Sequence, residues 1–354
     1  MIRTLNGIRF ILILMIMISH STLPIPQALH DYLGEFPVTM FFIISGFVLS
    51  LSYGEKLRKG EVSNKHFFLS RIFKLYPLHL FILAIIIPMD VRLGHLSWYQ
   101  IIAHITLLQS WIPFNQFVFN LNGPAWFLSD IIFFYFTFKW LYCWITSSPR
   151  LHTIVIVSAY IIGYVFLTLY IKEDYSSGYI YFFPLFRMID FCIGIFLYKF
   201  YRSQNGIYLY HRITKRISTG KAQLIDTMMI SMLVGIYPLS QDIAPNIRCA
   251  VLYWIPSVIM IFYVIVSEQG KGWLAQVLHN KFLLWLSNIS FEIYLCHALC
   301  LRLVQSIFLK IFGNDIPYLA VQFTISLALT LSLSWICKKY IVMPSYHYLS
   351  KAIA

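Results

Sequence analysis

Long apolar runs recur along this chain of 354 residues, and they constrain its fold more than any other feature. Hydrophobic residues make up 59% of the sequence and charged residues only 12%, whereas soluble domains contain about 25% charged residues. We identify ten runs as candidate membrane spans: Leu5 to Leu23, Val38 to Tyr53, Leu75 to Met89, Trp126 to Ile145, Leu151 to Ile171, Tyr181 to Phe200, Leu224 to Leu239, Ala250 to Val266, Leu283 to Phe312 and Pro317 to Ile336. The sequence therefore predicts an all-α, polytopic transmembrane helical bundle that occupies residues 1–354 as a single domain.

Basic residues concentrate in three segments, and these predict the topology. The segments are Gly54 to Lys74, Lys199 to Lys221 and the C-terminal region from Lys338 onward. Lysine and arginine favour the cytoplasmic side, and all three segments fall on one side only if an eleventh, short run, Trp98 to Trp111, does not cross. We therefore expect ten spans, both termini in the cytoplasm and a re-entrant or interfacial segment at 98–111.

The acidic residues agree with this topology, because seven of them then lie in outer connections: Asp31, Glu35, Asp90, Glu173, Asp174, Asp242 and Asp315. The net charge of +13 is explained by the orientation of the loops, so nucleic acid is not an expected partner. In the simplest interpretation, many of the basic residues serve only to orient the loops toward the cytoplasm.

The first run carries an arginine and a histidine, Arg9 and His20, with ten uncharged residues between them. Eleven helical positions are almost a whole number of turns, so both side chains would lie on one face, about 16 Å apart. Ionisable groups inside a bilayer are costly and usually functional. We interpret this pair as the centre of the function; a snorkelling Arg9 and a His20 bonded to a backbone carbonyl are the alternatives.

Other polar residues lie at defined depths in the predicted spans. Arg9, Arg71 and Lys74 sit at the inner mouth, whereas His20, Asp130 and His297 sit in the outer part. Such a bundle has a positively charged inner entrance and a histidine-lined pocket toward the outside. This layout suits group transfer from a cytoplasmic donor with phosphates, such as acyl-coenzyme A, with neutral His20 as the general base on an acceptor hydroxyl.

Three further positions near mid-membrane have structural interpretations. Arg187 and Asp190 are three residues apart, which predicts an ion pair on one helix face. Ser45, with Gly46, lies midway along the second run, where small residues let helices approach closely. His297, in the outer part of its span, could line the acceptor site or stabilise a kink.

The six cysteines lie in or at the ends of apolar runs, without the spacing of a disulfide framework or a zinc site. We find no phosphate-binding glycine loop, no nucleophile elbow and no internal repeat. We therefore expect neither a metal nor a permanently bound cofactor.

Several motifs, in order along nearly the whole chain, resemble those of the membrane acyltransferase 3 family, whose bacterial members O-acylate surface and exported polysaccharides. The matching segments are Leu5 to Arg9 with His20, Phe41 to Phe47, Arg71 to His79, Trp126 to Ser129 with Phe134 and Tyr135, Pro184 with Arg187, Asp190 and Gly194, and Leu286 to His297. Three positions depart from the family pattern. Lys74 replaces a second arginine, Thr39 replaces an acid found in many members, and Ile131 stands where the family has a glutamate, with Asp130 one residue early.

The resemblance implies an integral O-acyltransferase of the bacterial inner membrane that uses acetyl-coenzyme A and a free or lipid-linked saccharide. His20 would be the base or acyl relay, Arg9 would position the donor or stabilise developing charge, and Arg71 and Lys74 would hold the donor phosphates. Asp130, Arg187, Asp190, His297 and Ser45 would support the site or the acceptor. The rival interpretations are a glycan or lipid transporter without acyl chemistry, which the absence of an inverted repeat disfavours, and a relative that has lost activity. Whether the protein forms a homo-oligomer is left open.

Overall fold

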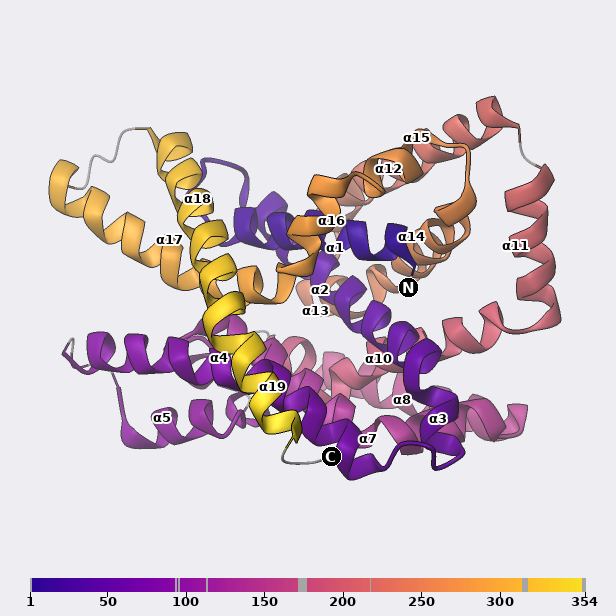
Figure 1. Ribbon diagram of the computed structural model, residues 1–354, viewed down its shortest axis with the longest axis horizontal. Helices are drawn as coiled ribbons and strands as arrows, with labels where there is room; N and C mark the ends of the chain where they lie inside the picture. The colour runs from indigo at the N-terminus through magenta and orange to yellow at the C-terminus, as the bar shows by residue number, and fades with distance from the viewer. Residues whose placement is uncertain are drawn as a thin grey trace.

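The computed structural model describes residues 2–92, 94, 96–112, 114–170, 177–216, 218–313 and 318–351, and all regular elements in these ranges are helical (Figure 1). The longer helices are α1 (Arg3–Ser19), α2 (Gln27–Leu49), α4 (Asn64–Arg92), α7 (Trp126–Ser147), α8 (Arg150–Tyr170), α10 (Pro184–Tyr201), α11 (Gln204–Arg216), α12 (Thr219–Gln241), α14 (Trp254–Val266), α17 (Ser290–Phe312) and α18 (Leu319–Cys337). The shorter ones are α3 (Glu55–Arg58), α5 (Trp98–Ile105), α6 (Asn115–Val118), α13 (Pro245–Ile247), α15 (Trp273–Leu278), α16 (Lys281–Asn288) and α19 (Met343–Lys351). Short π and 3₁₀ segments complete the fold: Ser50–Gly54, Gln109–Trp111, Gly123–Ala125, Ser177–Phe182, Arg248–Leu252, Ser267–Gln269 and Lys338–Val342. Ile171, Glu173, Asp174, Asp315 and Pro317 lie outside the described residues.

The predicted all-α class is confirmed for the described residues, and five stretches are long and apolar enough to cross a membrane. These are Gln27–Arg58, Asn64–Arg92, Thr219–Gln241, Ser290–Phe312 and Leu319–Lys351. The other predicted spans are also helical; α1 has 17 residues and α14 has 13, fewer than the roughly 20 that a perpendicular span needs, whereas α7 has 22 and α8 has 21. The multi-pass character is thus supported, while ten spans and cytoplasmic termini stay predictions.

Several predicted runs have different boundaries in the structure, because α2 begins at Gln27 and α4 at Asn64, each eleven residues before the predicted run. The run Leu283 to Phe312 is not one helix, because the chain bends at Ile289 and divides it into α16 and α17. The segment Trp98 to Trp111 forms the eight-residue helix α5 and a three-residue 3₁₀ turn. Eight residues rise only about 12 Å, so neither helix of this segment can cross a bilayer alone.

Asp90, which we expected in an outer connection, lies near the end of α4, and Asp31 and Glu35, for which we expected the same, lie within α2. The reason is tertiary, because the two carboxylates share one helix face and both bind Arg248. Its guanidinium lies 2.9 Å from Asp31 Oδ2 and 2.9 Å from Glu35 Oε2. The ion pairs compensate carboxylates that would otherwise be costly in an apolar bundle.

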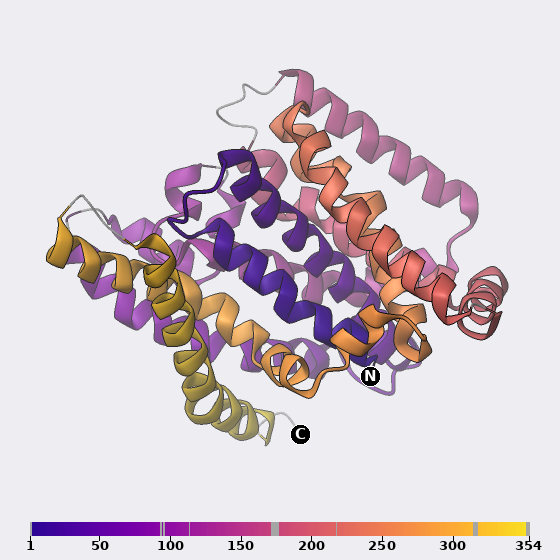
Figure 2. The same cartoon turned by 90° about the horizontal axis from the view of Figure 1, so that it is seen from above.

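Helices α1 and α2 lie side by side at the centre of the molecule and run antiparallel (Figure 2). On its other side α2 packs against α10, and glycine permits this contact. A Cβ atom added to Gly46 would lie 2.0 Å from the Phe191 carbonyl oxygen, and one added to Gly194 would lie 2.1 Å from that of Ile43. The predicted close packing at Gly46 is therefore confirmed.

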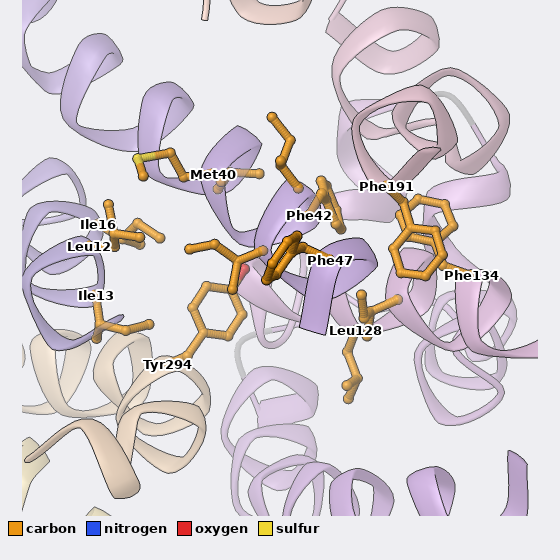
Figure 3. Packing of buried hydrophobic residues seen from close by; sticks show 14 of the residues in the cluster. Leu12, Ile13, Ile16, Met40, Phe42, Phe47, Leu128, Phe134, Phe191 and Tyr294 are labelled. Atoms are coloured by element: carbon orange, nitrogen blue, oxygen red, sulfur yellow. The ribbon is translucent and has the colours of Figure 1, made fainter. Parts of the chain in front are cut away.

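An aromatic core fills the space between α2, α7 and α10 (Figure 3). The Phe42 ring lies 5.2 Å from that of Phe134, which lies 5.3 Å from that of Phe191. These edge and tilted contacts are favourable geometries for aromatic pairs. They fix α2 relative to α7, and the functional side chains on both helices are positioned by this packing.

Candidate functional site

A cavity of about 620 Å³ lies between α1, α2, α4, α7 and α17, and three cationic residues from two of these helices line it. They are Arg9 on α1 and Arg71 and Lys74 on α4. Ser45 of α2 lines the same cavity. The residues predicted at the inner mouth are thus brought together in space.

Among the ion pairs formed by the described residues, none involves these three cations. Arg187, Arg248 and Arg302 are each paired with a carboxylate, by contrast. The cavity consequently carries excess positive charge. An anion that enters it would gain charge-assisted hydrogen bonds without first breaking an ion pair.

Neighbouring side chains hold the two guanidinium groups in place. Arg9 Nη1 donates to Asn6 Oδ1 at 3.5 Å, one turn earlier on α1. The guanidinium carbon of Arg71 lies 4.7 Å from the ring centroid of Tyr53 and 5.6 Å from that of Phe67, within cation–π range. The Arg71 Nε atom is buried without a hydrogen-bond partner, so this cation retains an unused donor.

Glu292, on the first turn of α17, is a buried acid for which the sequence suggested no role. Its side chain is almost fully buried, and its Oε2 atom has no hydrogen-bond partner. The carboxylate interacts electrostatically with Lys338, Lys74 and Arg9. Glu292 does not line the cavity, but its charge offsets part of the positive charge there. In the sequence, the only indication of a role for Glu292 was its depth in the apolar run.

His20 does not line the cavity; it is the exposed residue that follows the end of α1. Its Nδ1 atom lies 3.0 Å from Nε2 of the buried His297 on α17. The two rings are stacked, with centroids 5.2 Å apart. The structure thus joins two histidines that are 277 positions apart in the sequence.

The backbone sets the tautomers of this histidine pair. His297 Nδ1 lies 2.6 Å from the carbonyl oxygen of Tyr294, which can only accept, so Nδ1 carries the proton. In the neutral ring Nε2 is then an acceptor, and His20 Nδ1 donates to it. The lone pair of His20 is left on Nε2, the atom that faces away from His297.

A third histidine, His30 on α2, holds the connection that follows His20. Its Nδ1 atom lies 3.1 Å from the Ser19 carbonyl oxygen and its Nε2 atom lies 3.2 Å from that of Leu23. Carbonyl oxygens accept only, so both contacts are hydrogen bonds when the ring carries both protons. The ring therefore bridges the end of α1 and the loop beyond it.

Tyr294 connects the cavity with the histidine pair. Its ring lines the cavity and lies 5.8 Å from the ring of His297, centroid to centroid. Its carbonyl accepts the His297 proton, and its hydroxyl donates to the Pro124 carbonyl oxygen at 2.8 Å. A single residue therefore contacts both parts of the candidate site.

Asp130 lies outside the cavity. Its buried Oδ1 atom accepts a hydrogen bond from Ser110 Oγ at 2.8 Å, and Oδ2 has no hydrogen-bond partner. The neighbouring Ser129 Oγ donates to the Leu107 carbonyl oxygen at 2.5 Å. Both contacts fix the 98–111 segment to α7, whereas Ile131, at the position of the family's glutamate, lines the cavity. Consecutive residues of a helix are rotated by about 100° relative to each other, so Asp130 and Ile131 point in different directions.

Arg187 and Asp190 form the predicted ion pair, with Nη2 3.0 Å from Oδ2, and both are almost fully buried. Arg187 also donates to the Cys249 carbonyl oxygen and to Thr39 Oγ1, at 2.9 and 3.2 Å. Asp190 Oδ1 accepts from Trp254 Nε1 at 2.5 Å. Neither residue lines the cavity; together they link α10 to α2 and to the start of α14.

Comparison with known proteins shows similarity to acyltransferases over most of the chain. A family model described as an acyltransferase domain matches residues 2–339, which include every candidate residue above. Acyltransferase MdmB of Streptomyces mycarofaciens is 25% identical over 304 residues, which cover 81% of this chain and 72% of that protein. Protein 2 in picA locus of Rhizobium radiobacter is 34% identical over 87 residues, 23% of this chain and 41% of that protein. No solved structure matches the chain.

Proposed function

This chain belongs to the acyltransferase 3 family, and from that premise we propose that it transfers an acetyl group from acetyl-coenzyme A to a saccharide hydroxyl. The donor would enter from the cytoplasm, and the acceptor would be a cell-surface or exported saccharide, free or lipid-linked. The protein would act as a multi-pass enzyme of the bacterial inner membrane. No permanently bound cofactor or metal takes part in this proposal.

The observation that carries the proposal is the cluster of unpaired cations in the cavity. Arg9, Arg71 and Lys74 share one cavity with no carboxylate in ion-pair contact among the described residues. Guanidinium and ammonium groups recognise phosphates, and coenzyme A carries several. Arg71 and Lys74, both on α4, would hold the phosphates. Arg9, on α1, would position the thioester end.

The histidine pair supplies a base for the transfer. His20 Nε2 would take the proton of the acceptor hydroxyl while its oxygen forms a bond to the thioester carbonyl carbon. The carbon–sulfur bond then breaks, and coenzyme A leaves as a thiolate that receives the proton from His20. The products are an O-acetyl ester and free coenzyme A. Exposure of His20 at the end of α1 supports the approach of an acceptor from that side.

Thioester consumption by purified protein tests this function. Detergent-solubilised protein would be incubated with radiolabelled acetyl-coenzyme A and a panel of saccharides, comparing wild type, His20→Ala and the control His152→Ala. His152 is an exposed residue of α8. We expect the label to appear on a saccharide or on the protein with wild type and His152→Ala, and not with His20→Ala. A folded wild type that neither binds nor consumes the thioester would overturn the proposal and favour a transporter.

A further inference from the structure

The cavity does not reach the histidine pair, because four apolar side chains close the end that faces it. Along α1 the cavity lining ends at Ile13, whereas Ile16 and Met17 are buried in the core and do not line it. Along α17, which also leads toward the histidine pair, the lining ends at Tyr294. His20 follows Ile13 by seven residues, about 10 Å of helix rise.

Residues of α2 and α7 also lie at the end of the cavity that faces the histidine pair. A Cβ atom on Gly34 would lie 3.2 Å from Ser19 Oγ, which shows that the start of α2 lies beside the end of α1. Phe41 is therefore the lining residue of α2 nearest the histidine pair, and Phe127 holds the corresponding place at the start of α7. We call Ile13, Phe41, Phe127 and Tyr294 the apolar barrier.

The aromatic members of the apolar barrier are in contact with one another. The Phe127 ring centroid lies 5.3 Å from that of Tyr294 and 6.3 Å from that of Phe41. These separations are those of packed aromatic pairs, so the Phe127 ring is packed against both of the other rings. On its far side the Tyr294 ring lies against His297, whose ring stacks on His20.

The two rings at the closure are anchored differently. Tyr294 is held by the hydrogen bond from its hydroxyl to Pro124 and by the bond from His297 to its carbonyl. The side chain of Phe127 is half-buried at the cavity wall and packs through its ring, with a stacked contact to Phe42 at 4.4 Å. Of these two rings, Phe127 is therefore the one that can be shortened without removing a hydrogen bond.

We propose that Phe127, packed against Tyr294, determines the size of the acyl group that this enzyme accepts. The inference rests on the proposed function, because the carbonyl carbon of the donor must come within about 3–3.5 Å of an oxygen activated by His20. The acyl end must then displace part of the apolar barrier, and a longer acyl chain must displace the Phe127 ring farther than an acetyl group does. Truncation of this ring would lengthen the cavity toward His297.

Acyl-chain selectivity in a Phe127→Ala variant tests this inference. Binding of acetyl-, butyryl- and hexanoyl-coenzyme A to detergent-solubilised protein would be measured by displacement of radiolabelled acetyl-coenzyme A, together with release of free thiol from each. Phe136→Ala is the matched control, because Phe136 lies on the same helix, is exposed and does not line the cavity. Phe127→Leu provides a milder truncation if the alanine variant does not fold.

We expect the preference for acetyl over hexanoyl to fall about tenfold or more in Phe127→Ala, since extra methylenes would gain apolar burial. Phe127→Leu would show a smaller fall, and Phe136→Ala would keep the wild-type preference. A wild-type preference in both Phe127 variants, with acetyl-coenzyme A still bound, would overturn the role of Phe127 and leave the proposed function intact. Failure of the wild type to bind acetyl-coenzyme A would overturn the proposed function and this inference with it.

Discussion

The Nδ1 atom of His20 lies 3.0 Å from Nε2 of His297, and the proton on His297 Nδ1 is directed at the Tyr294 carbonyl. In the proposed function, His297 fixes the tautomer and orientation of His20 through these contacts. Second residues that orient a histidine in this way are common in catalytic sites, because a base must present the correct nitrogen to the proton that it takes.

Replacement of His297 by alanine is expected to lower kcat about a hundredfold, within the range that a positioned base contributes. The KM for acetyl-coenzyme A should stay near the wild-type value, because the cationic cavity is unchanged. Steady-state kinetics on the purified variant measure both quantities, with the exposed His347→Ala on α19 as control. A raised KM with an unchanged kcat would place His297 in donor binding instead.

Removal of the Arg71 guanidinium should weaken donor binding. We expect Arg71→Ala to raise the KM for acetyl-coenzyme A about tenfold to a hundredfold, because the donor loses one hydrogen bond between charged groups. Lys74→Arg should preserve or lower this KM, because guanidinium can bind phosphate through two hydrogen bonds. Lys65→Ala, an exposed cation on the same helix outside the cavity, should have no effect. Equal KM values for Arg71→Ala and wild type would exclude Arg71 from the donor site.

The contact between Asp130 and Ser110 predicts that an amide can replace the carboxylate. Asn retains an oxygen that accepts from Ser110, and Oδ2 has no hydrogen-bond partner to lose. Asp130→Asn should therefore keep activity within about threefold of wild type. Asp130→Ala should lower the free energy of unfolding by about 1–3 kcal/mol, because the buried Ser110 hydroxyl loses its acceptor. An inactive but normally folded Asp130→Asn protein would show that the carboxylate takes part in the chemistry.

The contact between α2 and α10 should not tolerate a side chain at Gly46. A Cβ atom there would lie 2.0 Å from the Phe191 carbonyl oxygen, so the helices would have to separate. We expect Gly46→Ala to destabilise the protein by about 1–3 kcal/mol or more, measured as a lower Tm in detergent. Gly235→Ala on α12 is the control, since an added Cβ meets nothing within 4 Å there. It should be neutral or slightly stabilising, because alanine favours a helix more than glycine does. Equal Tm values for the two variants would contradict the close packing.

The helical class and several local relationships were predictable from the sequence, because they depend on hydropathy and on the periodicity of a helix. The pairing of Arg187 with Asp190 follows from a spacing of three residues on one helix. The different directions of Asp130 and Ile131 follow from the rotation per residue. The close approach at Gly46 follows from its missing side chain. The grouping of Arg9, Arg71 and Lys74 was expected from their common depth.

Other relationships were decided only by the tertiary structure, because they join residues that are far apart in the sequence. The binding of Asp31 and Glu35 to Arg248 and the charges that surround Glu292 depend on neighbours from other helices. The same holds for the pairing of His20 with His297 and for the apolar barrier between them and the cavity. Apolar periodicity specifies that a helix forms, but side-chain packing between helices specifies which of its residues meet.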